Sequence, residues 1–311
     1  MNQKETLITL ILLFGILTIL VLLPSIKQTS ATYTDNTTVE SRVNISNVAP
    51  IVTVDYFYNN QSNPNDNIAL TEGGTTLVFC NGTIVDNNGW WDVGNLGYVN
   101  VSIYDKDYPT GAPDNNYRYL NGSCYREQIN ATAIFASCTI NMWFYANNDT
   151  WYCNMTAVDG GGEVGSGTKS NTVLPLYALD VNTTLIDYGE LAPGDSSPND
   201  VVVGITNFGN MDINVSVEGY AKTRGDGLAM NCTIGNISVE YEKYALQPGQ
   251  PVSSMTNLTS SPLPGGIEGL TILQNTDDNG NSTNSTYWKL EVPIGMGRGT
   301  CNGTVLFAAV Y

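Results

Sequence analysis

The sequence predicts an all-β protein with two β-sandwich domains that follow an N-terminal apolar segment. Three observations lead to this prediction. Short segments with alternating apolar and polar residues recur along the chain, clusters of Gly, Asn, Asp and Pro separate them, and no helical pattern of useful length interrupts them after the N-terminus. This pattern is typical of sandwiches, in which each strand turns one face toward a shared core.

Residues 1–31 predict an export segment. An unbroken apolar run extends from Leu7 to Leu23 and ends at Pro24. Its length fits either a signal peptide cleaved after Ala31 or an uncleaved signal-anchor helix in the membrane, and the sequence leaves both open. Either one places the rest of the chain outside the cell, secreted or tethered at the cell surface.

The exported part divides into a polar stalk, residues 32–48, and two sandwiches, residues 49–176 and 177–311. In the first sandwich we expect a flexible hairpin tip at 159–168, where Gly residues cluster. The strands expected there are 51–58, 75–85, 98–104, 137–145, 151–158 and 169–176.

Composition excludes several functions. Acidic residues outnumber basic ones by 29 to 12, which gives a net charge of −17 and argues against nucleic acid as a partner. The chain has no His, so Ser-His-Asp triads and His-ligated metal sites are excluded. Its carboxylates show no spacing that pairs two of them for glycoside cleavage. We therefore predict that the protein is not an enzyme and has no resident cofactor other than a candidate calcium ion.

The acceptor pattern Asn-x-Ser/Thr occurs 17 times. The composition alone would give about six sites, so the excess predicts N-glycosylation of an exported protein. Where a sequon lies in a strand pattern, its Asn falls on the face opposite the apolar residues, as in Val99-Asn100-Val101. The acceptors we favour are Asn81, Asn100, Asn121, Asn154, Asn214, Asn231 and Asn302.

Six cysteines in an exported chain predict three disulfides. Fifteen pairings are available, and the absence of Cys-x-x-Cys removes support for zinc or redox motifs. Cys80 and Cys153 each lie in a strand pattern, so we pair them across the first sandwich. Cys124 and Cys138 then flank a short hairpin or loop, and Cys232 pairs with Cys301 in the second sandwich.

The segment Asn147-Asn148-Asp149-Thr150-Trp151-Tyr152-Cys153 resembles the Asp-x-x-x-Tyr-x-Cys corner of immunoglobulin domains. Trp151 stands where the Tyr would be and Asn147 where the Asp would be, so no Tyr hydroxyl is available at that position. The resemblance implies an Ig-like sandwich for residues 49–176.

The second sandwich contains a similar signal. Residues 187–194 followed by 201–210 resemble the start of hydin-type Ig-like modules, with a strand at 187–194, a second strand within 201–210 and a hairpin return into 213–217. With its apolar N-terminus, dense sequons and acidic charge, the whole chain resembles an archaeal cell-surface protein.

Two groups of residues are candidate sites. Tyr108, Tyr117 and Tyr119 lie in a Tyr-rich stretch whose composition is typical of binding loops, and Trp90 with Trp91 adds a second aromatic group. Asn275, Asp277 and Asn279 alternate as calcium ligands do, although a polar turn is the favoured interpretation. Asp105 and Asp107 form another oxygen pair on either side of Lys106.

We therefore predict a glycosylated structural component of a cell envelope. The alternative is an adhesin or filament subunit that recognises a partner surface through the aromatic loop. In the filament version, residues 32–48 or the C-terminal strand would add to a neighbour's sheet. Partners would be the membrane, through the N-terminal helix, and other surface proteins or glycans.

Overall fold

The computed structural model describes residues 37–59, 62–277, 280 and 282–311. Strands dominate these residues, and the helical elements are single turns: η1 (Asp92–Leu96), η2 (Val239–Tyr241) and η3 (Val252–Ser254). The predicted all-β class is confirmed. The export segment at 1–31 lies outside the described residues, and among the residues that are described no helix has the length and apolar character needed to span a membrane.

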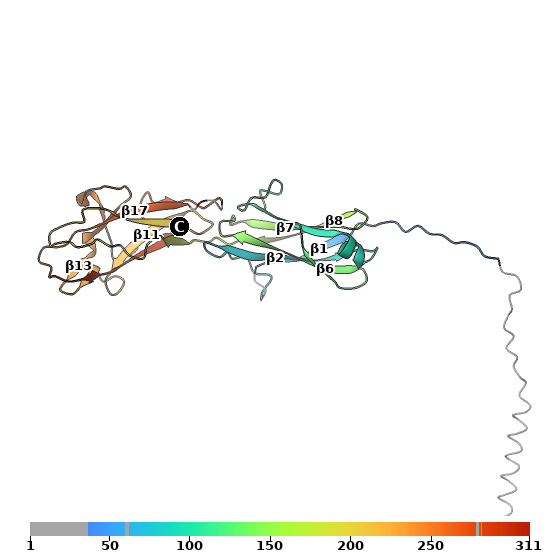
Figure 1. The fold of residues 1–311 in the computed structure, drawn as a ribbon, viewed down its shortest axis with the longest axis horizontal. Coiled ribbons are helices and arrows are strands. Elements are labelled where there is room, and N and C mark those ends of the chain that lie inside the picture. The colour runs from blue at the N-terminus through green and yellow to red at the C-terminus, as the bar shows by residue number, and fades with distance from the viewer. Residues whose placement is uncertain (1–36, 60–61, 278–279, 281) are drawn as a thin grey trace, which may run out of the picture. The chain divides into compact units, whose positions relative to one another are not determined.

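The first sandwich consists of two antiparallel four-stranded sheets (Figure 1). One sheet has the order β1 (Ile51–Tyr58), β2 (Thr75–Val85), β6 (Ala133–Trp143), β5 (Tyr125–Gln128). The other has the order β4 (Arg118–Asn121), β3 (Tyr98–Asp105), β7 (Thr150–Val158), β8 (Val164–Thr172). Alternate residues of the central strands are buried, so the apolar faces of both sheets meet in one core.

The centre of this core is the Cys80–Cys153 disulfide, which joins β2 to β7 across the two sheets. Trp151 is fully buried beside it, and its Nε1 donates a hydrogen bond of 2.8 Å to the carbonyl of Asn147. An immunoglobulin corner uses a Tyr hydroxyl to bond back to the chain a few residues upstream. Trp151 makes the equivalent bond four residues upstream, so the corner persists with a different donor.

The prediction for the hairpin tip was too long. The turn covers only residues 159–163, and β8 starts at Val164, whereas a strand was expected at 169–176. Gly165 and Gly167 lie so close to the carbonyls of Pro50 and Val52 that neither position has room for a side chain. Glycine in a strand marks this kind of close backbone approach, and in the sequence it looks like a loop.

The second sandwich is built from a five-stranded sheet and two three-stranded sheets. The five-stranded sheet has the order β15 (Thr256–Asn257), β14 (Glu242–Ala245), β17 (Thr283–Leu290), β10 (Val201–Asn207), β9 (Leu179–Val181). The smaller sheets are β16 (Thr271–Ile272), β11 (Ile213–Tyr220), β19 (Thr304–Val310), and β13 (Asn236–Ser238), β12 (Leu228–Cys232), β18 (Cys301–Asn302). Fully buried Trp288 lies in the main core of this half.

Two details of the second sandwich were predicted wrongly. β10 and β11 do not form a hairpin, because β10 pairs with β9 and β17 while β11 pairs with β16 and β19. Residues 187–194 form no strand. Buried Asn207 explains the crossing between the sheets: its side-chain amide donates to the carbonyls of Met211, Ile272 and Leu273, and its oxygen accepts from the amide of Gly209.

The structure contains the three disulfides that the sequence predicts, Cys80–Cys153, Cys124–Cys138 and Cys232–Cys301. Asn47–Tyr311 form one compact unit, so the domain boundary at 176/177 stays a prediction. Asn210 is fully buried between the two halves, where its amide nitrogen donates to the carbonyls of Ala146 and Leu174 and its oxygen accepts from the amide of Leu176.

We expect the disulfides to differ in their effect on stability. Loss of Cys80–Cys153, which spans 73 residues, should lower the free energy of unfolding of the first sandwich by about 4 kcal/mol, because it frees the longer loop of the unfolded chain. Loss of Cys124–Cys138, which spans 14 residues, should cost about 3 kcal/mol. Denaturant titration of the two Cys→Ala pairs measures this, and a larger loss for the shorter loop would contradict it.

Candidate functional site

An aromatic pair lies on the surface of the first sandwich. The rings of Tyr108 and Tyr117 stack with centroids 4.1 Å apart. Tyr108 is 44% exposed, and Tyr117 is partly buried. Stacking favours one arrangement of the two rings, so this part of the predicted binding loop presents a contiguous aromatic surface.

The prediction for Tyr119 was wrong. Tyr119 lies on β4 with only 7% of its surface exposed, and its ring packs against Trp151. Its hydroxyl donates to the carbonyl of Asn115 and accepts from the amide of Trp143. The stretch before Cys124 contains a short strand that sequence reasoning missed, and that strand carries Tyr119 into the core.

The two tryptophans of the other aromatic group behave differently. Trp90 is partly buried and packs against the core of the first sandwich, so it contributes little surface for a partner. Trp91 is 47% exposed. Binding through Trp91 stays a prediction.

The predicted calcium loop is not formed by the residues that the structure describes. Asn275 is buried and turns its amide nitrogen toward the carbonyl of Asp277 at 2.7 Å, which is the geometry of a polar turn. Asn279 lies outside the described residues. The other oxygen pair, Asp105 and Asp107, lies beside Asp149, but Lys106 forms ion pairs with both Asp107 and Asp149.

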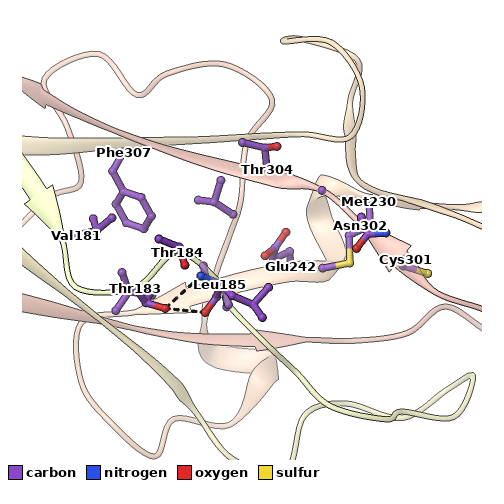
Figure 2. Close-up of a pocket in the computed structure, with 14 residues that line it drawn as sticks. Val181, Thr183, Thr184, Leu185, Met230, Glu242, Cys301, Asn302, Thr304 and Phe307 are labelled. Atoms are coloured by element: carbon purple, nitrogen blue, oxygen red, sulfur yellow. Dashed lines mark hydrogen bonds between the residues drawn. The ribbon is translucent and has the colours of Figure 1, made fainter.

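A feature that the sequence did not reveal is a groove in the second sandwich, between the terminal strands of two facing sheets. β9 is an edge strand of the five-stranded sheet, and β19 is an edge strand of a three-stranded sheet. A cavity of about 270 Å³ opens between them. Figure 2 shows Phe307 and Val181 at one end, Cys301 and Asn302 at the other, and Glu242 between them. The cavity is smaller than typical small-molecule sites, which measure about 300–1,000 Å³, so it fits inserted side chains better than a free ligand.

The free edge of β19 forms one rim of this groove. β19 pairs with β11 along Thr304–Val310, and among the described residues no backbone hydrogen bond extends from its other edge. The six residues Val305–Val310 are all apolar, and each is only partly buried, although Val305, Phe307 and Ala309 pack against the core. Natural edge strands are usually protected by Lys, Pro, a bulge or a covering loop, and this strand contains neither a charged residue nor Pro.

Glu242 gives the groove an unusual chemical property. Its side chain is only 2% exposed, and its Oε1 accepts a 2.7 Å hydrogen bond from the hydroxyl of Tyr188. Burial raises the pKa of Glu242 from 4.5 to about 7, and the bond from Tyr188 offsets part of that rise. The pKa of Tyr188 is also raised, first by burial and then by the charge of Glu242. Among the described lining residues Glu242 is the only acid, so the groove lacks the carboxylate pair of a glycosidase.

The sequons are compatible with glycosylation. Of the 17, those at Asn36, Asn60 and Asn281 lie outside the described residues, and none of the other acceptor Asn residues is buried. Their modification stays a prediction.

No protein-family model and no curated protein matches this chain. Solved structures with similar arrangements include the chaperone-tip adhesion subunit complex of the archaic Csu pili of Acinetobacter baumannii (TM-score 0.41, 11% identity, 84% of this chain and 100% of that chain). Others are a carbohydrate-binding module of the β-sandwich superfamily (TM-score 0.25, 11% identity, 85% and 98%) and the C-terminal domain of an AgI/II polypeptide of Streptococcus agalactiae (TM-score 0.25, 8% identity, 84% and 99%). TM-scores this low carry no conclusion about function.

Glu242 should make stability depend on pH. The folded state keeps its proton up to about pH 7, whereas the unfolded chain releases it near pH 4.5, so the contribution is complete below pH 4.5 and is lost as the pH rises through 7. The loss should amount to about 3 kcal/mol between pH 4.5 and pH 8. Denaturant unfolding of the wild type and of Glu242→Gln, which retains an acceptor for Tyr188, measures it. Parallel pH profiles of the two proteins would contradict the prediction.

Proposed function

We propose that the chain is an extracellular filament subunit that joins its neighbours by strand addition. The observation that carries this proposal is the apolar, unpaired edge of β19 beside a groove in the second sandwich. An added strand would satisfy the free backbone groups of β19 and cover its apolar side chains. This is the alternative that the sequence left open, and it accounts for the edge better than a simple coat protein does.

The donor in this proposal is residues 37–46 of a second copy. These residues form no strand within the chain, and three of their apolar side chains are almost fully exposed: Val39 at 88%, Val43 at 81% and Ile45 at 85%. All three occupy odd positions, so an extended backbone places them on one face. A strand with one apolar face is what the groove beside β19 requires.

The positions of donor and acceptor in the sequence determine the assembly. The donor precedes the first sandwich, and the acceptor is the last strand of the second. Contact between two different surfaces of identical subunits is heterologous, and it produces an open filament unless the rotation closes a ring. Repeated addition would therefore yield a linear polymer.

The extracellular location rests on the cysteines. All six form disulfides, and disulfides persist in oxidising compartments. In the proposed filament the accessible sequon Asn residues carry glycans on the outer surface, and the apolar segment at 1–31 directs export. The proposal also includes an archaeal source and a second sandwich of the hydin type.

A charge in the donor should block assembly. We expect Val43→Asp to abolish filaments, because burying a carboxylate in an apolar groove costs several kcal/mol, while the isolated subunit folds normally since Val43 is exposed. Arg42→Asp is the matched control: it places a carboxylate on the opposite face and changes the net charge more. Electron microscopy of cells expressing each full-length variant reads the outcome, and filaments formed by Val43→Asp would refute the proposal.

Cross-linking tests which copy supplies the donor. Val43→Cys combined with Val305→Cys, a β19 residue that lines the groove, should give disulfide-linked oligomers of the full-length protein, and either substitution alone should not. A link that forms only within one chain would mean that the segment completes its own β19, and it would overturn the filament model.

The stacked Tyr108–Tyr117 pair favours a second, adhesive role for the same subunit. Truncating a central aromatic anchor typically costs about 2 kcal/mol or more of binding free energy. We therefore expect Tyr108→Ala with Tyr117→Ala to reduce adhesion to a partner surface about thirtyfold while filaments still form. Exposed Tyr98 replaced by Ala is the matched control. Unchanged adhesion of the double variant would leave the pair with a purely structural role.

A further inference from the structure

Three buried aspartates converge at one end of the first sandwich. Asp86 follows β2, Asp159 follows β7, and Asp92 is the first residue of η1. They are 2%, 4% and 5% exposed, in that order. One carboxylate oxygen from each lies within 4.8 Å of the other two. The cluster therefore places three acidic groups from two facing sheets and the loop after β2 around one point.

Among the described residues, nothing neutralises these charges. None of the three aspartates forms an ion pair there. The nearby Arg126 donates instead to the carbonyls of Val93 and Gly97, at 2.9 and 2.6 Å. Isolated buried carboxylates are strongly disfavoured, and like charges this close disfavour one another further.

One oxygen of the cluster has no hydrogen-bond partner among the residues that the structure describes. Oδ2 of Asp86 is fully buried and unpaired, whereas Oδ1 of the same group accepts from the amide of Asn88 at 2.7 Å. A buried polar atom without a partner costs about 1–3 kcal/mol, more if charged, and native proteins rarely leave one without a reason. An ion held among the carboxylates would supply the missing partner.

Backbone donors hold the remaining carboxylates in place. Oδ1 of Asp92 accepts from the amide of Gly160 at 3.0 Å. Oδ1 of Asp159 accepts from the amides of Gly161 and Glu163, each at 2.9 Å. These bonds come from fixed turns, so the three acids stay together even though their charges repel.

We propose that Asp86, Asp92 and Asp159 bind one calcium ion. All the ligand atoms are hard oxygens, and neither Cys nor His is present in the cluster, which disfavours zinc and copper. The three groups come from separate segments of the chain, and calcium accepts such irregular oxygen sites more readily than magnesium, which demands near-ideal octahedral geometry. A divalent cation would remove most of the buried negative charge.

The cluster of Asp105, Asp107 and Asp149 provides a contrast within the same sandwich. It has the same chemical composition, but Lys106 already pairs with Asp107 and Asp149, and two of its three acids are more exposed. In this second cluster the ammonium group of Lys106 already compensates the negative charges, so no ion is needed. It is therefore the matched control for the first.

The proposed ion also lies where the chain enters the sandwich. The side-chain nitrogen of Asn47 donates to Asp159 at 3.0 and 3.1 Å, and the amide of Val48 donates to the side-chain oxygen of Asn88 at 2.8 Å. Calcium would thus fix the ends of β2 and β7 together with the first residues of the compact unit. The inference stands without the filament proposal, because it rests on different residues.

Thermal unfolding of the full-length protein tests the site. In millimolar calcium, the melting temperature of the wild type should rise by about 5–10 °C over its value in EDTA, as expected for an ion at about 100 times its Kd. Asp86→Asn with Asp92→Asn should lose this rise and, in EDTA, should melt no lower than the wild type, because repulsion has been removed. Asp105→Asn with Asp107→Asn should keep the rise.

A second measurement avoids dependence on folding stability. Terbium should bind the wild type and luminesce on excitation of Trp90 and Trp91, which directly precede Asp92, and calcium should displace it. The Asp86/Asp92 variant should lose at least ten times in terbium affinity. A wild type without any calcium-dependent shift, or equal terbium binding by wild type and variant, would overturn the proposal.

Discussion

The first sandwich depends on one contact between its sheets, the Cys80–Cys153 bridge packed beside Trp151. Cys80 also faces Cys138 on the neighbouring strand, and Cys138 is bonded to Cys124. Together with the pairing of β2 and β6, the two bridges therefore connect β7 through β2 and β6 to the segment before β5. The hydrogen bond from Trp151 to Asn147 fixes the turn that starts β7, so the same residue that fills the core also sets the chain's direction.

Amide side chains, one of them buried, connect the two halves. Asn210 reaches the carbonyls of Ala146 and Leu174, and Gln274 donates to the carbonyl of Tyr145 at 2.8 Å. A buried polar group without partners is costly, but a satisfied one specifies a unique arrangement. Asn207 and Asn210 lie three residues apart, so one short segment both directs the chain from β10 to β11 and joins the halves.

The sequence predicted those features that repeat with the strand period. β1 and β2 were predicted at their observed bounds because their apolar residues alternate regularly. The first residues of β8 were missed because its inner positions there hold glycines, whose small size matters only when the neighbouring backbone is known. Tyr119 was misplaced for a related reason: a four-residue strand within a polar stretch carries too few apolar positions to reveal its period. The aspartate cluster joins Asp159 to Asp92 and Asp86, which lie 67 and 73 positions earlier in the chain, a proximity that only the fold creates.

The two sandwiches differ in whether their edge strands are covered. In the first, glycines let the edge strand β8 approach β1 at backbone distance, so two sheet edges cover each other. In the second, β9 and β19 occupy comparable edge positions, but β9 has only three residues, and the outer backbone edge of β19 stays unpaired while its apolar side chains are only partly buried. A strand with six consecutive apolar residues and no protective charge would aggregate unless it had a specific partner. Residues 37–46 combine three highly exposed apolar side chains on one face with the absence of any strand of their own, so in the proposed filament the same chain supplies both the acceptor edge and the donor strand.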